Sequence, residues 1–327
     1  MKILLSMPND GQSNNYIINA LQDLQFDVYF VDHRNFLEKC RKTVPEILKR
    51  EKPDYMMVLY LADKHTYTRD DLRSFKMCSP NTKFISWIFD VVINGELACE
   101  NEKFLDLMKE YDYFFTVAKG HVEQFRSKGI NTYWGQEGCC PYSHMPIESF
   151  SADGHKIQNL DITFIGQIGQ KQFHNDRIKL LETIVKKYNK VRIYGHIYDI
   201  SQSLIPYHMG RPTFNDIEHN KIVNRTKINI GNSGWTDIDG YMSARNYRIC
   251  AASGFLLANH SKSINEFYSQ DEIGTYENIS DCLSRIEYYL ENDEVRNQMR
   301  LKAYDRTINN YTFTNSLEKM FKVIKEN

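Results

Sequence analysis

The fold is decided by the stretch GNSGWTDIDGYMSARNYRICAASGFLLANHSKSINEF at residues 231–267. A strand predicted at 227–230 stops at Gly231, and a polar loop leads into a short helix predicted at 243–252. Ser253-Gly254 ends this helix, and the apolar run 255–258 predicts a buried strand. Ligands of open parallel α/β sheets bind beyond the carboxyl ends of the strands. The stretch therefore predicts a ligand site formed by its loop and helix.

The first half of the chain repeats the order strand, then helix. The apolar patterns predict strands at 2–6, 27–31, 55–61, 83–89, 113–117 and 130–134, and helices at 15–24, 36–52, 100–109 and 121–128. Strands that alternate with helices indicate a parallel sheet covered on both faces.

The alternation lapses from 135 to 159, where Gly, Cys, Pro, Ser and His replace the apolar periodicity, and then restarts. The second half predicts strands at 160–165, 191–194, 227–230, 255–258 and 273–276, and helices at 176–187, 214–224, 243–252, 279–290, 293–309 and 312–325. We expect an α/β fold of two Rossmann-like domains that face a cleft. Their expected bounds are 1–145 and 146–310, with a C-terminal helix in 311–327 that packs back on the first domain.

Composition excludes several classes of protein. The 41 basic and 42 acidic residues give a formal net charge of −1, so no broad basic field for nucleic acid is expected. The longest apolar runs, such as 56–62, are strand-sized and too short to span a bilayer. The N-terminus lacks the pattern of a signal peptide, which predicts a cytoplasmic protein and leaves peripheral membrane association open. Seven cysteines, vicinal Cys139 and Cys140 included, form no Cys-x-x-Cys pair, so we expect reduced thiols and neither disulfides nor zinc.

The second half resembles the GT-B glycosyltransferases, in particular the CgeB-like branch and the wider group 1 family. DITFIG at 161–166, with Arg177 downstream, is similar to the family's first C-terminal strand, glycine turn and basic residue. RNYRICAASGFLL at 245–257 is similar to the pattern Arg-x-aromatic-Glu-x-x-Ala-x-Gly followed by a buried strand. INEFY at 264–268 and NYTF at 310–313 extend the resemblance, which is best over 161–321, roughly half of the chain. The first half matches more loosely, through KILL at 2–5, WIFD at 87–90 and YDYFFT at 111–116.

Two positions depart from that pattern. Arg248 stands where the family carries a glutamate that commonly holds the ribose of the donor, and Ser253 replaces the usual glycine. The contacts to the nucleotide and the sugar are therefore open, as is the choice between retention and inversion.

The resemblance implies a nucleotide-diphosphate sugar bound mainly against the second domain, without a metal. Helix N-terminal amides and basic side chains neutralise the diphosphate in such enzymes. The expected binding residues also include a hydrogen-bond acceptor for the ribose hydroxyls and aromatic rings that could stack on the base or the sugar. The predicted donor-binding residues are Gly166, Lys171, Arg177, Tyr194, Gly195, His196, Tyr241, Arg245, Asn246, Arg248 and Glu266.

The first domain is expected to supply a general base. Asp90 ends the strand at 83–89 in the apolar company of Trp87, Phe89 and Val91. Such surroundings raise the pKa of a carboxylate and suit it to deprotonate an acceptor hydroxyl. Asp10 and Glu137 are weaker candidates. A base fits inversion, whereas retention would need the donor phosphate to take the proton.

Two short sequence patterns that could indicate a metal or a dinucleotide cofactor are weak. Asp237-Ile-Asp239 matches the metal-binding Asp-x-Asp pattern of GT-A enzymes, but the pattern is short and lies in the second half, so no metal is expected. Gly166-x-x-Gly169 falls short of the dinucleotide fingerprint.

The leading hypothesis is a glycosyltransferase that moves a sugar from a nucleotide diphosphate onto a glycan or protein hydroxyl. A nucleotide-sugar 2-epimerase shares the two-domain architecture and is the alternative within enzymes. A catalytically inactive GT-B module that binds a nucleotide or glycan is the alternative of another class, motivated by Arg248.

Overall fold

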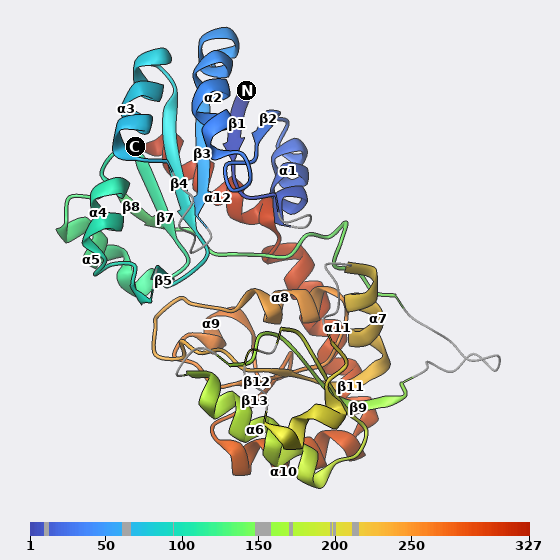
Figure 1. Ribbon diagram of the computed structural model, residues 1–327. Helices are drawn as coiled ribbons and strands as arrows, with labels where there is room; N and C mark the ends of the chain where they lie inside the picture. The colour runs from blue at the N-terminus through green and yellow to red at the C-terminus, as the bar shows by residue number, and fades with distance from the viewer. Residues whose placement is uncertain are drawn as a thin grey trace. The chain divides into compact units, whose positions relative to one another are not determined.

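The computed structural model describes residues 1–9, 13–60, 67–93, 95–147, 158–169, 173–196, 198, 201–210 and 216–327. They form two compact α/β units (Figure 1). Unit 1 comprises Met1–Glu137, Ile238–Tyr241 and Phe313–Asn327, and unit 2 comprises Gly138–Asp237 and Met242–Thr312. Each unit has a parallel sheet, so the predicted fold class is confirmed.

Unit 1 contains a parallel sheet of six strands in the order β2-β1-β3-β4-β7-β8. The strands are β1 (Lys2–Ser6), β2 (Asp27–Val31), β3 (Tyr55–Tyr60), β4 (Lys83–Ile88), β7 (Tyr113–Thr116) and β8 (Thr132–Trp134). The short antiparallel pair β5 (Val92–Ile93) and β6 (Glu96–Leu97) follows β4 and was not predicted. Asp90 thus lies in the segment between the end of β4 and this pair.

Helices cover both faces of the first sheet because its side chains alternate between them. Leu4, Met56, Phe84 and Phe114 share one core with apolar residues of the helices α2 (Leu37–Glu51), α3 (Arg69–Cys78), α4 (Glu102–Met108) and α5 (Val122–Ser127), the last preceded by the 3-10 turn η1 (Lys119–His121). On the other face lie α1 (Ser13–Asp23) and α12 (Phe313–Glu326), which contact one another. There the Phe313 ring lies 6.2 Å from that of Trp87.

Helix α3 is missing from the sequence prediction. Its start is marked by a capping box, in which Thr68 Oγ1 accepts from the Asp71 N–H and Asp71 accepts from the Thr68 N–H. The Thr-x-x-Asp spacing was therefore available as a signal, although Asp replaces the more usual Glu or Gln.

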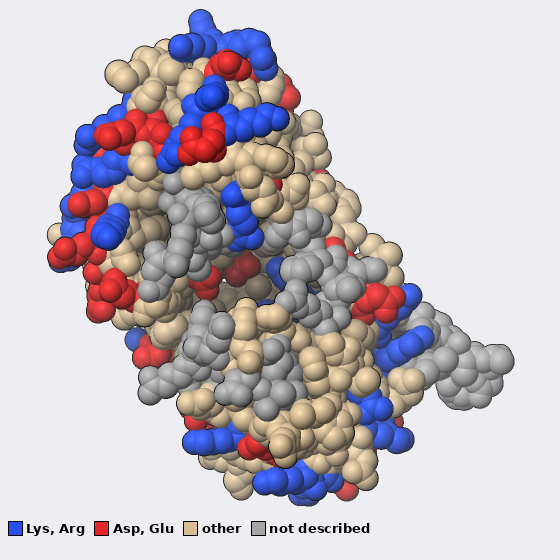
Figure 2. All heavy atoms as spheres, viewed as in Figure 1, with Lys and Arg blue, Asp and Glu red and all other residues tan. Residues whose placement is uncertain are grey.

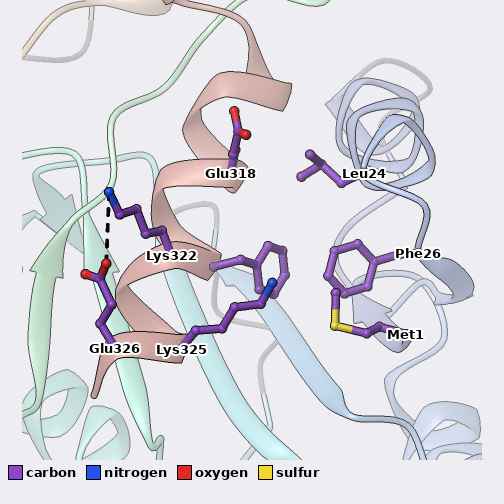
Figure 3. Close-up of a pocket in the computed structure, with 8 residues that line it drawn as sticks. Met1, Leu24, Phe26, Glu318, Lys322, Lys325 and Glu326 are labelled. Carbon is purple, nitrogen blue, oxygen red and sulfur yellow. Dashed lines mark ion pairs between the residues drawn. The ribbon is translucent and has the colours of Figure 1, made fainter.

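A hollow of about 470 Å³ opens beside α12 in unit 1 (Figure 3). Met1, Leu24, Phe26 and Phe321 form its apolar wall, and the Phe26 and Phe321 rings lie 4.5 Å apart. Lysine and glutamate residues of α12 line the rest, so its charges are balanced.

Unit 2 contains a parallel sheet of five strands in the order β10-β9-β11-β12-β13. The strands are β9 (Leu160–Ile165), β10 (Val191–Tyr194), β11 (Thr226–Gly231), β12 (Leu256–Asn259) and β13 (Gly274–Tyr276). The helices are α6 (Phe173–Lys187), α7 (Asp216–Arg225), α8 (Ala244–Ala251), α9 (Ile264–Phe267), α10 (Ile279–Glu291) and α11 (Asp293–Asn310), and the 3-10 helix η2 (Gln202–Tyr207) precedes α7.

The two faces of the second sheet also differ in the helices that they contact. Phe164, Ile193 and Leu257 share a core with α6 and α10. Asn229 alternates to the other face, where its amide donates to the carbonyl of Val223 in α7. Thr163 donates to the Asn229 side-chain oxygen over 2.9 Å, so this buried amide is satisfied inside the sheet.

Surface charge is mixed in both units. Figure 2 shows Lys and Arg interspersed with Asp and Glu over the described residues in view. In the part of the chain that the structure describes, no helix is long and apolar enough to cross a membrane.

Helix α8 ends in a Schellman motif whose left-handed residue is not glycine. The Gly254 N–H donates to Ile249, the Ser253 N–H donates to Cys250, and Ser253 has φ of +56°. Left-handed backbone costs an L-residue about 1–2 kcal/mol, which is why glycine is usual here. Arg300 donates to the Ser253 hydroxyl over 2.8 Å and to its carbonyl over 3.4 Å.

We predict that Ser253→Gly and Ser253→Ala separate these two effects. Both substitutions remove the hydroxyl that accepts from Arg300, but only alanine keeps the left-handed strain. Ser253→Ala should therefore be less stable than Ser253→Gly by roughly 1 kcal/mol in urea unfolding. Equal stabilities of the two variants would contradict the assignment of strain to this residue.

Candidate functional site

The candidate site lies where the strand order of unit 2 reverses. Strand β9 has β10 on one side and β11 on the other, so the connections that follow β9 and β10 leave in opposite directions. This arrangement opens a crevice outside the carboxyl ends of the strands. The residues at these ends are Ile165 of β9 and Gly231 of β11.

Two predicted arginines converge at this switch point. Arg177 comes from α6 and Arg245 from the first turn of α8. Their guanidinium carbons lie 5.3 and 4.9 Å from the centre of the Phe164 ring, next to the end of β9. Guanidinium groups are attracted to the face of an aromatic ring at such distances. Arg177 and Arg245, which are 68 positions apart in the sequence, thus both lie against the Phe164 ring.

Arg245 is half-buried, and its guanidinium donates hydrogen bonds at the carboxyl ends of β9 and β11. Its Nε donates to the Ile165 carbonyl over 2.5 Å, and its Nη1 donates to the Asn232 carbonyl over 3.0 Å. Its Nη2 lies so close to Gly166 that a Cβ added there would be 2.2 Å from it. A side chain at 166 would therefore displace the arginine, whose guanidinium lies against the backbone that begins the loop after β9.

Arg177 is 4% exposed and directs its donors to the backbone. It donates to the Gln167 carbonyl, and its Nη2 donates to the Asn232 carbonyl over 2.7 Å. Its Nε donates to the Asn232 side-chain oxygen over 3.1 Å. We interpret Arg177 as a positioning residue that ties the loop after β9 to the loop after β11, since so buried a side chain presents little of its charge to a ligand.

Asn232 and Tyr276 were not among the predicted site residues. The Asn232 amide donates to the Tyr276 hydroxyl over 3.2 Å, and that hydroxyl donates to the Gly231 carbonyl over 3.0 Å. Burial raises the pKa of Tyr276, so it stays a neutral donor. The available signal was position, because Asn232 directly follows a strand and Tyr276 ends another.

The loops after β9 and β10 are held together by close backbone packing. The Gly166 N–H donates to the Tyr194 carbonyl and the Ile168 N–H to the His196 carbonyl, both over 2.9 Å. Gly195 has φ of +131°, and a Cβ there would lie 2.0 Å from the Gly166 carbonyl oxygen. The prediction that this glycine permits close backbone approach agrees with the geometry. The His196 ring lies perpendicular to that of Tyr198 at 4.1 Å.

Tyr194 and Asn246 direct their side chains elsewhere. The Tyr194 ring lines a separate hollow beside α7. Asn246 is 2% exposed, its amide lies 2.9 Å from the Met242 sulfur, and its oxygen packs against Gly231. Asn246 is therefore buried where α8 packs on the end of β11.

Two further predicted residues, Glu266 and Tyr241, lie outside the group around Phe164, and a third, Lys171, is not described. Glu266 is exposed on the four-residue helix α9. Tyr241 belongs to the segment Ile238–Tyr241, which is part of unit 1. Lys171, like the weaker base candidate Asp10, lies outside the described residues.

Asp237 and Asp239 fall in different units. Asp237 is the last residue of its segment of unit 2, and Asp239 belongs to unit 1. There the Asp239 carbonyl accepts from the Gly120 N–H over 2.9 Å, and its carboxylate lies 3.8 Å from Lys119 Nζ. The Asp239 carboxylate thus already faces a cation.

Arg248 lies among histidines. The His144 ring accepts from the Cys140 N–H over 3.0 Å, lies 3.9 Å from Asp216 Oδ1, and is 6.2 Å from the His219 ring. Burial and then the positive charge of Arg248 lower the pKa of His144 well below its usual value and the pKa of His219 to about 4. Both histidines are therefore neutral at pH 7, and Arg248 carries the positive charge of this cluster.

Asp90 is the predicted base and lies in unit 1 at the carboxyl end of β4. It is half-buried and is flanked by the buried Phe89 and Val91. Trp87, on the same strand, donates its indole N–H to the Gly135 carbonyl over 2.9 Å. The carboxylate is thus attached to a strand whose end is fixed by a buried side-chain hydrogen bond.

The seven cysteines are free thiols. Burial raises the pKa of Cys139 to about 12, and the pKa of Cys250 likewise. A protonated buried thiol is a poor nucleophile, so these cysteines pack as small apolar groups.

Comparison with solved structures identifies the fold. A glycosyltransferase from Rickettsia africae matches over 99% of this chain and 98% of its own, with a TM-score of 0.63 and 13% identity. HepE from Anabaena, solved with UDP and glucose, matches over 100% of both chains with a TM-score of 0.67 and 9% identity. Sucrose-phosphate synthase from Thermosynechococcus elongatus matches over 100% of this chain and 98% of its own, with a TM-score of 0.63 and 10% identity. The fold is that of the GT-B glycosyltransferases.

The match to a family model lies in the second half of the chain. Residues 176–322 match the family model described as glycosyl transferase-like. The predicted resemblance to the group 1 glycosyltransferases is confirmed, whereas its CgeB-like part stays a prediction. A search of the curated proteins gave no match.

We predict that Gly166→Ala and Arg245→Ala are strongly non-additive. The added methyl group of Gly166→Ala meets Arg245 at its three nearest contacts, so it should destabilise the wild type by roughly 1–3 kcal/mol. In the Arg245→Ala background the same methyl group should cost much less, because its obstacle is gone. Urea unfolding of the two single variants and the double variant measures the coupling. Additive effects would contradict the contact.

We also predict that the two histidines beside Arg248 make the free energy of unfolding depend on pH. Both folded-state pKa values lie below the ordinary value near 6.5, so the contribution of the histidines to stability is complete above pH 6.5 and is lost as the pH falls, toward about 4 for His219. Each histidine adds a slope of at most about 1.4 kcal/mol per pH unit in that window. Arg248→Gln should raise both pKa values and flatten the slope, measured by urea unfolding from pH 7.5 to 4.5. An unchanged slope would show that the Arg248 charge does not reach the rings.

Proposed function

We propose that the protein transfers a sugar, of hexose type, from a nucleotide diphosphate to a glycan or protein hydroxyl without a metal ion. The observation that carries this proposal is the half-buried guanidinium of Arg245 at the switch point, against the backbone of Gly166. Support also comes from HepE, which was solved in complexes with UDP and with UDP-glucose.

The geometry suggests how the diphosphate would be held. Arg245 presents its cation beside the backbone of Gly166, at the start of the loop after β9. Arg177 and Asn232 would keep the loops after β9 and β11 at a fixed separation, through the hydrogen bonds that join them. Positive charge fixed before the reaction stabilises a leaving diphosphate without reorganisation. Arg245 would thus supply the charge that a metal supplies in other transferases.

Asp90 is proposed as the general base for the acceptor. A carboxylate accepts the proton of the attacking hydroxyl as the bond between the anomeric carbon and the diphosphate oxygen breaks. The new glycosidic bond forms at that carbon, and the nucleotide diphosphate leaves with the electron pair. Direct attack of this kind inverts the configuration.

The first test of the proposal is thermal unfolding with UDP, GDP, dTDP, CDP and CMP, each with and without Mn²⁺. A ligand at ~100 times its Kd stabilises the folded state by about 2.7 kcal/mol, which shifts Tm by a few degrees. We expect one diphosphate to raise Tm without Mn²⁺, and Arg245→Ala to abolish that shift. Arg285→Ala, which changes the same residue type on α10, is the matched control and should keep it. A shift in Arg245→Ala equal to that of the wild type would remove this arginine from the site.

Asp90→Asn tests the catalytic part separately. The amide keeps the shape of the carboxylate but cannot take a proton, so turnover should fall by about 10²–10⁴-fold. Binding of the nucleotide diphosphate, measured by the same thermal shift, should not change. An unaltered rate would exclude Asp90 as the base, and turnover of donor without an added acceptor would favour an epimerase.

A further inference from the structure

Unit 2 has a second hollow, between the edge strand β10 and helix α7, with a volume of about 390 Å³. On β10 it is lined by Arg192 and Tyr194, which are two residues apart and therefore share a face of the sheet. None of the residues in the group around Phe164 lines it. Pockets of this volume accept small molecules.

The other wall is one stripe of α7. Glu218, Lys221, Ile222 and Arg225 recur with the spacing of a single helix face, and all four line the hollow. The buried residues of α7 are Asn220, Val223 and Asn224, so this stripe lies beside the face of α7 that is buried. The stripe carries two cations and a carboxylate, and Glu218 and Arg225 are exposed. The hollow therefore has a charged wall that a ligand can reach from solvent.

The charges of the hollow are not balanced. Glu218 pairs with Lys221 over 3.0 Å. Arg192 donates to the Val191 carbonyl over 2.7 Å, and in the described part of the chain neither Arg192 nor Arg225 forms an ion pair with a carboxylate. Two guanidinium groups thus remain in excess at one small hollow.

Tyr194 lines the hollow together with both arginines. Burial raises its pKa, and the charges of Arg192 and Arg225 oppose that rise. The hydroxyl therefore stays protonated at neutral pH and can donate a hydrogen bond to an anion. Forked guanidinium donors together with a hydroxyl donor suit the oxygens of a phosphate group.

We propose that this hollow, formed by Arg192, Tyr194, Lys221 and Arg225, is a second binding site for a small phosphorylated molecule, distinct from the nucleotide site. The site does not depend on the proposed function. The phosphate group is recognised by the two arginines, and the rest of the hollow leaves room for a body the size of a sugar.

The test uses calorimetric titration of the full chain with inorganic phosphate, glucose 6-phosphate and glucose, at constant ionic strength. We expect saturable binding of the phosphorylated probes and none of glucose. The double variant Arg192→Gln, Arg225→Gln should weaken binding by about 100-fold, since each hydrogen-bonded charge contributes on the order of tenfold. Arg285→Gln on α10 removes the same charge outside the hollow and should bind as the wild type does.

The comparison of probes shows whether the hollow binds free phosphate or a phosphate monoester. Equal affinity for inorganic phosphate and glucose 6-phosphate would mean a site for free phosphate, and tighter binding of glucose 6-phosphate would mean a site for a phosphate monoester. Should the double variant fail to fold, Tyr194→Phe is expected to weaken binding several-fold without a charge change.

Three results would overturn the proposal: wild-type affinity in the double variant, binding of glucose as tight as that of glucose 6-phosphate, or loss of the glucose 6-phosphate site in Arg245→Ala. Failure of the proposed function gives a different result. In that case no nucleotide would shift Tm, whereas the titration with glucose 6-phosphate would be unaffected.

Discussion

The close approach of two backbone segments at Gly166 and Gly195 is the constraint on which the site of unit 2 depends. The Gly166 N–H donates to Tyr194, and Gly195 packs on the Gly166 carbonyl with a left-handed backbone. No side chain fits at either position without displacing its neighbour. This packing leaves space on the other side of Gly166 for the Arg245 guanidinium. A charged side chain can therefore lie against the ends of two strands at once.

Arg177 and Arg245 are both arginines beside Phe164, but they have different roles. Both lie over Phe164 and both donate to the Asn232 carbonyl. Arg177 is buried and holds loops, whereas Arg245 is half-buried at the crevice. The sequence predicted that both would be near the ligand. It could not separate them, because burial depends on how α6 and α8 pack on the sheet.

Apolar periodicity was enough to predict the fold class and most strands. The strands at 2–6, 27–31, 160–165 and 191–194 begin and end where they were predicted, because each is a short apolar run bounded by turn residues. Helix α3 was missed because its amphipathic pattern is short and follows a polar segment, although Thr68 and Asp71 mark its start. Asn232 and Tyr276 were missed for another reason. Their roles come from hydrogen bonds between the ends of β11 and β13, which no local pattern encodes.

The two departures from the family pattern have different physical meanings. Ser253 keeps the left-handed geometry that glycine ordinarily provides, and Arg300 bonds to its hydroxyl, so the backbone at this position is preserved despite the substitution. Arg248 changes the chemistry of its position, because a cation now lies beside two histidines that it helps to keep neutral. A carboxylate there would favour protonation of the same rings. The first departure therefore preserves the left-handed turn after α8, and the second places a fixed positive charge beside two neutral histidines.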